Sequence, residues 1–122
     1  MRERKILWAV TDQRGLSVSL AEDVWPDHVH KHPEIAAYFD EIKLTAQQPD
    51  EIYFDPLSSA RRKPGTSIHL YHKRKLGRGK YKDTLIVVVV KSLEENSERQ
   101  GFVESALLSD RIMNRLVLEW KQ

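Results

Sequence analysis

One run of apolar residues constrains the fold of this chain more than any other feature. Residues 85–90 read Leu-Ile-Val-Val-Val-Val, without a polar residue among them. β-Branched residues favour strands, and an unbroken apolar run of this length is typical of a strand that is buried on both faces. The run is also far shorter than the ~20 residues that a membrane-spanning helix requires. It therefore predicts the central strand of a sheet.

Chain length and composition predict a single domain that spans residues 1–122. Hydrophobic residues make up 40% of the chain and charged residues 31%, which is polar but far from the composition of a disordered protein. The absence of cysteine excludes disulfides, thiolate metal sites and cysteine nucleophiles. The charged N-terminus leads into only a short apolar stretch, residues 6–10, so we expect no signal peptide, no membrane segment and a cytoplasmic location.

The first half of the chain predicts a hairpin followed by two helices. Residues 5–10 and 16–21 read as strands with a turn between them. Asp23 is placed to cap a short helix, and Pro33 separates that helix from a second, longer one. In the second helix, apolar residues recur at helical spacing and form one stripe. The stripe consists of Ile35, Tyr38, Phe39, Ile42 and Ala46.

The second half of the chain predicts strands joined by loops. Four segments have the alternating or apolar pattern of strands, namely 51–54, 68–73, 83–91 and 102–108. Polar segments between them read as loops and turns, namely 55–66, 76–82 and 92–100. The last segment, 110–120, fits either a docked helix or a strand over 116–120. The fold class that follows is α+β, with two helices on one face of a curved, mostly antiparallel sheet and the other face open for binding.

Charge is strongly segregated along the chain, although the net charge is only +2. Residues 22–51 contain eight acidic residues and two lysines, whereas residues 56–82 contain nine basic residues and no acidic one. A basic segment of this kind can neutralise phosphates and so bind nucleic acid with the release of counterions. The alternative is a solvated surface that balances the acidic helix within the same molecule.

The three histidines of residues 28–32 form the first candidate for chemistry, because the chain has only five histidines in all. Imidazoles titrate near neutral pH, so His28 and His32 can divide the roles of general base and general acid. They share a helical face if the helix continues through His32. A transition-metal site is the competing hypothesis, and a purely structural role at the helix junction is the third.

The predicted strand over residues 68–73 carries the second candidate. Its period of two places His69, Tyr71 and Lys73 on one face and Ile68 and Leu70 on the other. A cation, a phenol and an imidazole on an open sheet can bind phosphate and stack on bases. An ordinary solvent-exposed face is the alternative.

The order of these motifs resembles that of the phage-type barnase–EndoU–colicin–RelE-like nuclease families. The pattern Trp-x-x-His-Val-x-Lys-His-Pro-Glu begins at Trp25 and is followed by the amphipathic helix and by Gln-Pro-Asp-Glu-Ile from Gln48. Two strands complete the pattern. In the first, Tyr71 stands beside basic residues, and the second is apolar and ends in Lys91. The resemblance covers about residues 22–112 and rests on the order and spacing of the motifs.

The resemblance implies a metal-independent endoribonuclease of the toxin type that cleaves RNA by attack of the 2′-hydroxyl on the adjacent phosphate. It implies no cofactor, and it implies a cognate antitoxin or an immunity-type protein as a partner besides RNA. The catalytic residues that we carry over are His28, His32, Lys73, Lys91 and Ser105. The residues expected to contact nucleic acid are His69, Tyr71, Arg74, Arg61 and Arg62.

Two residues depart from the family pattern. Leu107 stands where the family has a tyrosine, and Glu104 adds an acid beside Ser105. A carboxylate that faces the site would repel phosphate. The second hypothesis is therefore a catalytically degenerate RNA- or protein-binding module of the same fold.

Overall fold

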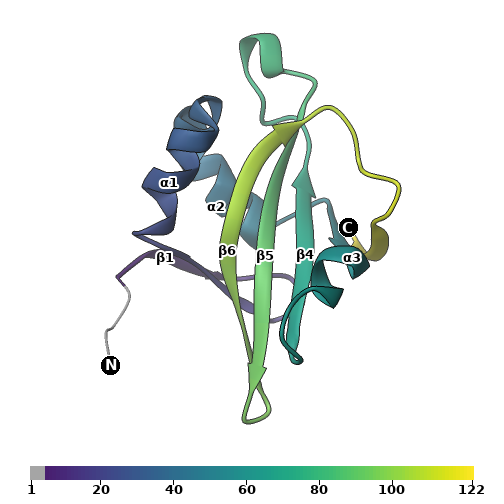
Figure 1. Ribbon diagram of the computed structural model, residues 1–122. Coiled ribbons are helices and arrows are strands. Elements are labelled where there is room, and N and C mark those ends of the chain that lie inside the picture. The colour runs from purple at the N-terminus through teal and green to yellow at the C-terminus, as the bar shows by residue number, and fades with distance from the viewer. Residues whose placement is uncertain (1–4) are drawn as a thin grey trace.

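The computed structural model describes residues 5–122, in which seven strands form one sheet in the order β1-β2-β6-β5-β4-β3-β7 (Figure 1). Neighbouring strands are antiparallel, except that β2 runs parallel to β6. The α+β class and the mostly antiparallel sheet are therefore confirmed. The strands are β1 Ile6–Thr11, β2 Ser17–Ala21, β3 Glu51–Phe54, β4 Thr66–Lys73, β5 Leu85–Glu95, β6 Glu98–Ser109 and β7 Val117–Lys121.

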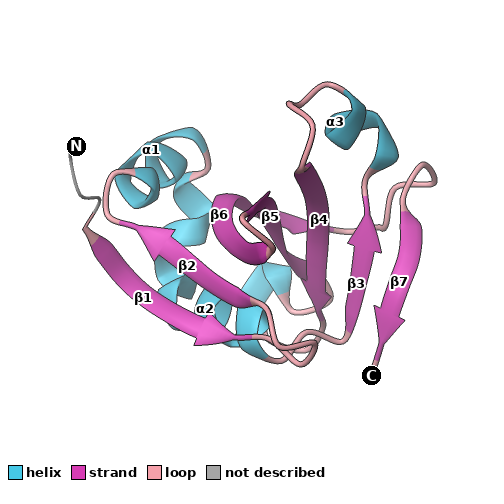
Figure 2. Ribbon diagram, turned by 90° about the horizontal axis from the view of Figure 1, so that it is seen from below, coloured by secondary structure: helices cyan, strands magenta, loops and turns pink. Residues whose placement is uncertain are grey.

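Helices lie on both sides of this sheet. The helices are α1 Val24–Lys31, α2 Phe39–Gln47 and α3 Pro56–Ala60, with 3₁₀ turns at Pro33–Tyr38 and Gly79–Tyr81. α2 covers one face, α1 lies beside β6, and α3 lies against the opposite face (Figures 1 and 2). We call these two faces of the sheet the α2 face and the α3 face. The hairpin of β1 and β2 curves across the α2 face toward β3 and β7 (Figure 2).

The sheet has a hydrophobic cluster on each face. On the α2 face, Val88 and Val90 of β5 pack with Ile42 of α2 and with side chains of β1, β2 and β6. On the α3 face, Val87 packs with Leu70 and neighbouring apolar residues. Alternate residues of the apolar run thus point to opposite clusters, which confirms the central strand that is buried on both faces. Among residues 5–122, no helix is long and apolar enough to cross a membrane.

The second predicted helix is divided in two. Residues Pro33–Tyr38 form a 3₁₀ turn, and the α-helix begins only at Phe39. Tyr38, with φ −117° and ψ 23°, breaks the helical geometry between them. The prediction of one continuous helix is therefore wrong, but Ile35, Tyr38 and Ile42 of its stripe are buried as the periodicity indicates.

Two predicted loops contain regular structure. β5 and β6 continue through residues 92–100 and meet at a two-residue turn of Asn96 and Ser97, both with positive φ (52° and 67°). These strand ends extend beyond the core, so their side chains are polar and carry no hydrophobic signal. In the segment 55–66, Pro56 begins α3, and the Asp55 side chain caps it by accepting a hydrogen bond from the Ser58 N–H at 3.1 Å.

The C-terminal segment adopts the strand alternative. β7 pairs with β3, with Glu51 opposite Lys121 and Phe54 opposite Val117. The helix alternative for residues 110–120 is wrong. Because β7 lies at one end of the strand order and β1 at the other, contacts between the β1–β2 turn and β7 connect the two edges of the sheet.

Candidate functional site

A break in the pairing of β5 with β6 positions Glu104. Val89 pairs with Ser105 and Val90 pairs with Val103, so Glu104 is the extra residue of a β-bulge. Bulges re-aim side chains and occur next to functional sites. β2 pairs with β6 only up to Phe102, so the bulge begins where the pairing with β2 ends. α1 lies beside β6 (Figure 1).

The Glu104 carboxylate accepts two hydrogen bonds from Arg62, both 2.6 Å long. The side chains of Arg62 and Glu104 are 33% and 31% exposed, so the pair is accessible from solvent. The hydrogen bond from Arg62 is the largest influence on the carboxylate and lowers its pKa, and the charges of Lys91 and His28 act in the same direction. Arg62, Lys91 and His28, from three separate parts of the chain, therefore gather around this one carboxylate.

Lys91 and Ser105 lie on the α3 face of the sheet. Lys91 is opposite Ile68 and Ser105 is opposite Val89, and both partners contribute to the apolar cluster of that face. Side chains that are directly opposite in neighbouring strands point to the same side of a sheet. Two of the predicted catalytic residues thus share the α3 face.

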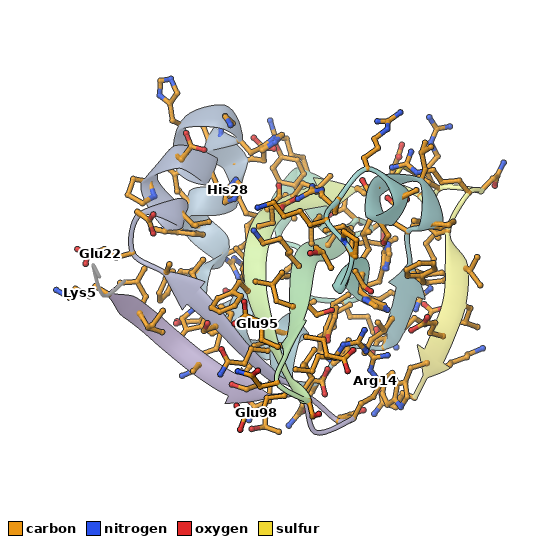
Figure 3. The ribbon with its side chains drawn as sticks, turned by 60° about the horizontal axis from the view of Figure 1, so that its bottom comes forward. Lys5, Arg14, Glu22, His28, Glu95 and Glu98 are labelled. Carbon is orange, nitrogen blue, oxygen red and sulfur yellow. The ribbon has the colours of Figure 1, made fainter. Side chains whose placement is uncertain are left out.

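His28 approaches the same region from α1. It projects from α1 toward the sheet (Figure 3), and it is only 7% exposed. Burial lowers the pKa of its imidazole, against the opposing effect of the Glu104 backbone. Its Nδ1 is buried without a hydrogen-bond partner. Together, Arg62, Lys91, Glu104, Ser105 and His28 define the Glu104 site.

The other two histidines of this segment lie outside the site. α1 ends at Lys31, and His32 follows with a non-helical φ of −132°, so His28 and His32 do not lie on one continuous helix. His32 Nδ1 is 3.8 Å from a Glu34 carboxylate oxygen, and His30 is exposed. Among residues 5–122, no three histidine or acidic side chains are placed to hold a metal ion together.

Tyr71 and His69 are not on an open face, and their predicted contact with bases is wrong. Tyr71 is fully buried in the cluster of the α2 face and donates a 2.5 Å hydrogen bond to Asp12 Oδ2. His69 is 5% exposed, and its Nε2 is 2.8 Å from Glu119 Oε2. The predicted alternation along β4 is correct, but the side chains of Tyr71 and His69 are covered by other parts of the fold and are not exposed to a ligand.

Lys73 and Arg74 lie too far from the Glu104 site to act in it. Lys73 is opposite Ile86, whereas Lys91 is five residues further along the same strand, a separation of about 17 Å. Lys73 Nζ donates to the Gln48 carbonyl at 2.7 Å, and Arg74 pairs with Glu51. Of the remaining predicted residues, Arg62 belongs to the site and Arg61 is exposed beside it.

A second group of ionisable side chains lies at the β1–β2 turn and was not predicted. Arg14 bonds Glu119 of β7 at 3.2 Å and lies beside that strand (Figure 3), and Glu119 also bonds His69. Asp12 accepts from Tyr71 and from two backbone N–H groups of the turn. Asp12, Tyr71 and His69 are buried and hydrogen-bonded, so we interpret this group, which we call the polar latch, as structural. Its members are up to 105 residues apart in sequence, which left no local signal to predict it.

Comparison with known proteins finds no matching family model, no matching curated protein and no matching solved structure. The interpretation of the site therefore rests on its own residues. Glu104 was expected to repel phosphate if it faces the site. Its charge is compensated by Arg62, a residue 42 positions away, and only the folded chain brings the two together.

Proposed function

We propose that the protein is a metal-independent endoribonuclease of the toxin type and that the Glu104 site performs the reaction. The observation that carries the proposal is one ionised carboxylate, Glu104, that is bonded by Arg62 and stabilised by the charges of Lys91 and His28, with Ser105 next to it on β6. These are the group types that RNA transesterification needs: a base, cations for the phosphate and an imidazole. An α+β fold with a mostly antiparallel sheet is also what the sequence resemblance implies.

The first step of the proposed reaction uses the cations and the carboxylate. Arg62 turns from Glu104 to the substrate phosphate, which Lys91 also binds, and this frees the carboxylate to accept the proton of the 2′-hydroxyl. The 2′-oxygen then attacks phosphorus, and the two cations stabilise the added negative charge of the transition state. Ser105 donates a positioning hydrogen bond to the phosphate.

The second step releases the 5′-oxygen. The bond between phosphorus and the 5′-oxygen breaks, and the leaving oxygen takes a proton from His28. Burial lowers the pKa of His28 in the unbound protein, and the negative phosphate raises it once RNA is bound, so that the imidazole takes up from solvent the proton that it then donates. The products are a 2′,3′-cyclic phosphate and a free 5′-hydroxyl. We expect this activity in the cytoplasm, under the control of a cognate antitoxin or an immunity-type protein.

A second candidate function is an RNA-binding module without catalysis. One observation favours it: Arg62 occupies both oxygens of Glu104, and His28 is buried. In that case Lys91 and the exposed Arg61 neutralise phosphates, and RNA binding weakens with salt.

One experiment separates the two functions. Folded protein is incubated with single-stranded RNA in EDTA at several pH values between about 5 and 9, and both binding and products are measured. Cleavage that ends in a 2′,3′-cyclic phosphate and is lost in Glu104→Gln supports the nuclease. Salt-dependent binding without any product supports the binding module.

A further inference from the structure

A groove on the α3 face has an apolar floor and a partly polar rim. It lies between α3, strands β4 to β6 and the segment 109–115, and it has a volume of about 210 Å³. A cavity of ~150 Å³ holds a benzene molecule, so this groove has room for a planar heterocycle. Its floor consists of Ile68, Leu70, Val87, Val89 and Leu107.

One polar group of the groove has hydrogen-bonding capacity that the protein leaves unused. His72 lines the groove and is 1% exposed, and its Nδ1 has no hydrogen-bond partner. Such buried polar atoms are uncommon, because each one loses its bond to water. The other buried polar residue of the wall, Asp55, is satisfied by Arg115 at 3.0 Å and by the Ser58 N–H. A ligand with a polar ring edge would find its partner in His72.

A basic depression adjoins this groove. It has a volume of about 420 Å³, and Arg111 lines both cavities. Within residues 5–122, the side chains of Lys75, Lys82 and Arg111 form no ion pair, whereas Arg74 is already paired with Glu51. Asp83 and Asp110 are the acidic residues of the lining, so the cations are in excess.

We propose that the groove and the basic depression form one binding site for a free nucleoside monophosphate. The base occupies the groove, where apolar residues contact its faces and His72 bonds its edge. The phosphate occupies the depression, where Lys75, Lys82 and Arg111 balance its charge. A neutral aromatic compound would leave these cations unused, and inorganic phosphate would leave the groove empty.

This site is separate from the Glu104 site. None of the residues that line the two cavities belongs to the Glu104 site. The proposal therefore does not depend on the nuclease hypothesis, and it adds a small-molecule ligand to a chain whose proposed substrate is a polymer.

Isothermal titration of the full chain with AMP, UMP, adenosine and inorganic phosphate tests the proposal. We expect AMP or UMP to bind more tightly than adenosine and phosphate. Arg111→Gln, an exposed position, weakens nucleotide binding about tenfold or more because it removes a charge-assisted bond. Leu107→Trp fills the groove and abolishes nucleotide binding, while binding of inorganic phosphate is unchanged.

One control variant accounts for a general loss of charge. Lys43→Gln removes an exposed charge on α2, outside both cavities, so it leaves nucleotide binding unchanged. Circular dichroism verifies that each variant is folded. Binding of AMP and UMP no tighter than that of phosphate, or equal binding in wild type, Arg111→Gln and Leu107→Trp, would overturn the proposal even if RNA cleavage is observed.

Discussion

Arg62 donates two parallel hydrogen bonds of 2.6 Å to Glu104 and so joins the segment after α3 to the bulge of β6. Paired geometry of this kind is directional and holds the carboxylate in its charged form. Because both side chains are about one-third exposed, the pair contributes only on the order of 1 kcal/mol to stability. Its main consequence is to hold a carboxylate and a guanidinium side by side at the bulge of β6.

The first prediction concerns Arg62 and RNA affinity. Arg62→Gln removes a cation that we assign to the phosphate, so RNA binding weakens across sequences and the slope of log affinity against log salt falls by about 1. Filter binding or fluorescence anisotropy at several salt concentrations measures this slope. Lys43→Gln, on α2, is the matched control and leaves the slope unchanged. Equal slopes for wild type and Arg62→Gln would remove Arg62 from the RNA interface.

The second prediction separates the polar latch from function. Tyr71→Phe leaves Asp12 buried without the hydroxyl that it accepts from, so the free energy of unfolding falls by roughly 1–3 kcal/mol. Urea unfolding followed by circular dichroism measures the change. RNA affinity of the folded variant stays the same. Lower RNA affinity at unchanged stability would restore Tyr71 as a base-stacking residue.

The third prediction is a loss of stability in mild acid. Burial lowers the pKa of His72, and likewise those of His28 and His69, below the ordinary value of 6.5. Below about pH 6.5 the unfolded chain therefore binds more protons than the folded one. The contribution of these histidines is fully present above that pH and is lost as the pH falls through the folded-state values.

Urea unfolding at pH 7.5 and at pH 5 measures this effect. In His72→Phe, the difference in unfolding free energy between the two pH values becomes smaller than in wild type, because one of the three groups no longer titrates. His30→Gln is the control, since His30 is exposed. A larger pH dependence in His72→Phe than in wild type would contradict the account.

The fourth prediction concerns the turn between β5 and β6. Ser97 has a φ of 67°, in the left-handed region that costs a residue with a β-carbon roughly 1–2 kcal/mol. Ser97→Gly relieves this cost, and Asn-Gly is the preferred sequence for such a two-residue turn. We expect the midpoint of thermal unfolding to rise. A fall in the midpoint would show that Ser97 makes a stabilising contact that outweighs its backbone strain.

Local patterns predicted the parts of this fold that depend on local chemistry. The apolar run at 85–90 predicted the central strand, and Gly15 with its neighbours predicted the first hairpin. The ends of β5 and β6 were missed because polar residues that pair beyond the core have no hydrophobic period. For residues 110–120 the sequence fitted either a helix or a strand. The pairing of β7 with β3, which is distant in sequence, selects the strand.

The candidate site was predicted only in part, for a related reason. Four residues of the site were named from the sequence, and the fold brings them to the bulge between β5 and β6. They are His28, Arg62, Lys91 and Ser105. Tyr71 and Lys73 were misplaced because periodicity gives the two sides of a strand but does not say which side is covered. That information depends on α2, on the β1–β2 hairpin and on long-range partners such as Asp12.

The central claim is that the Glu104 site, and not the far end of β4, cleaves RNA. The most direct measurement compares RNA cleavage in EDTA for wild type, Glu104→Gln, Lys91→Gln and Lys73→Gln, each verified as folded. We predict that the cleavage rate falls roughly 10²- to 10⁴-fold in Glu104→Gln, falls in Lys91→Gln, and is unchanged in Lys73→Gln. Cleavage that survives in Glu104→Gln and Lys91→Gln but is lost in Lys73→Gln, or no cleavage by wild type at any pH between about 5 and 9, would contradict the claim.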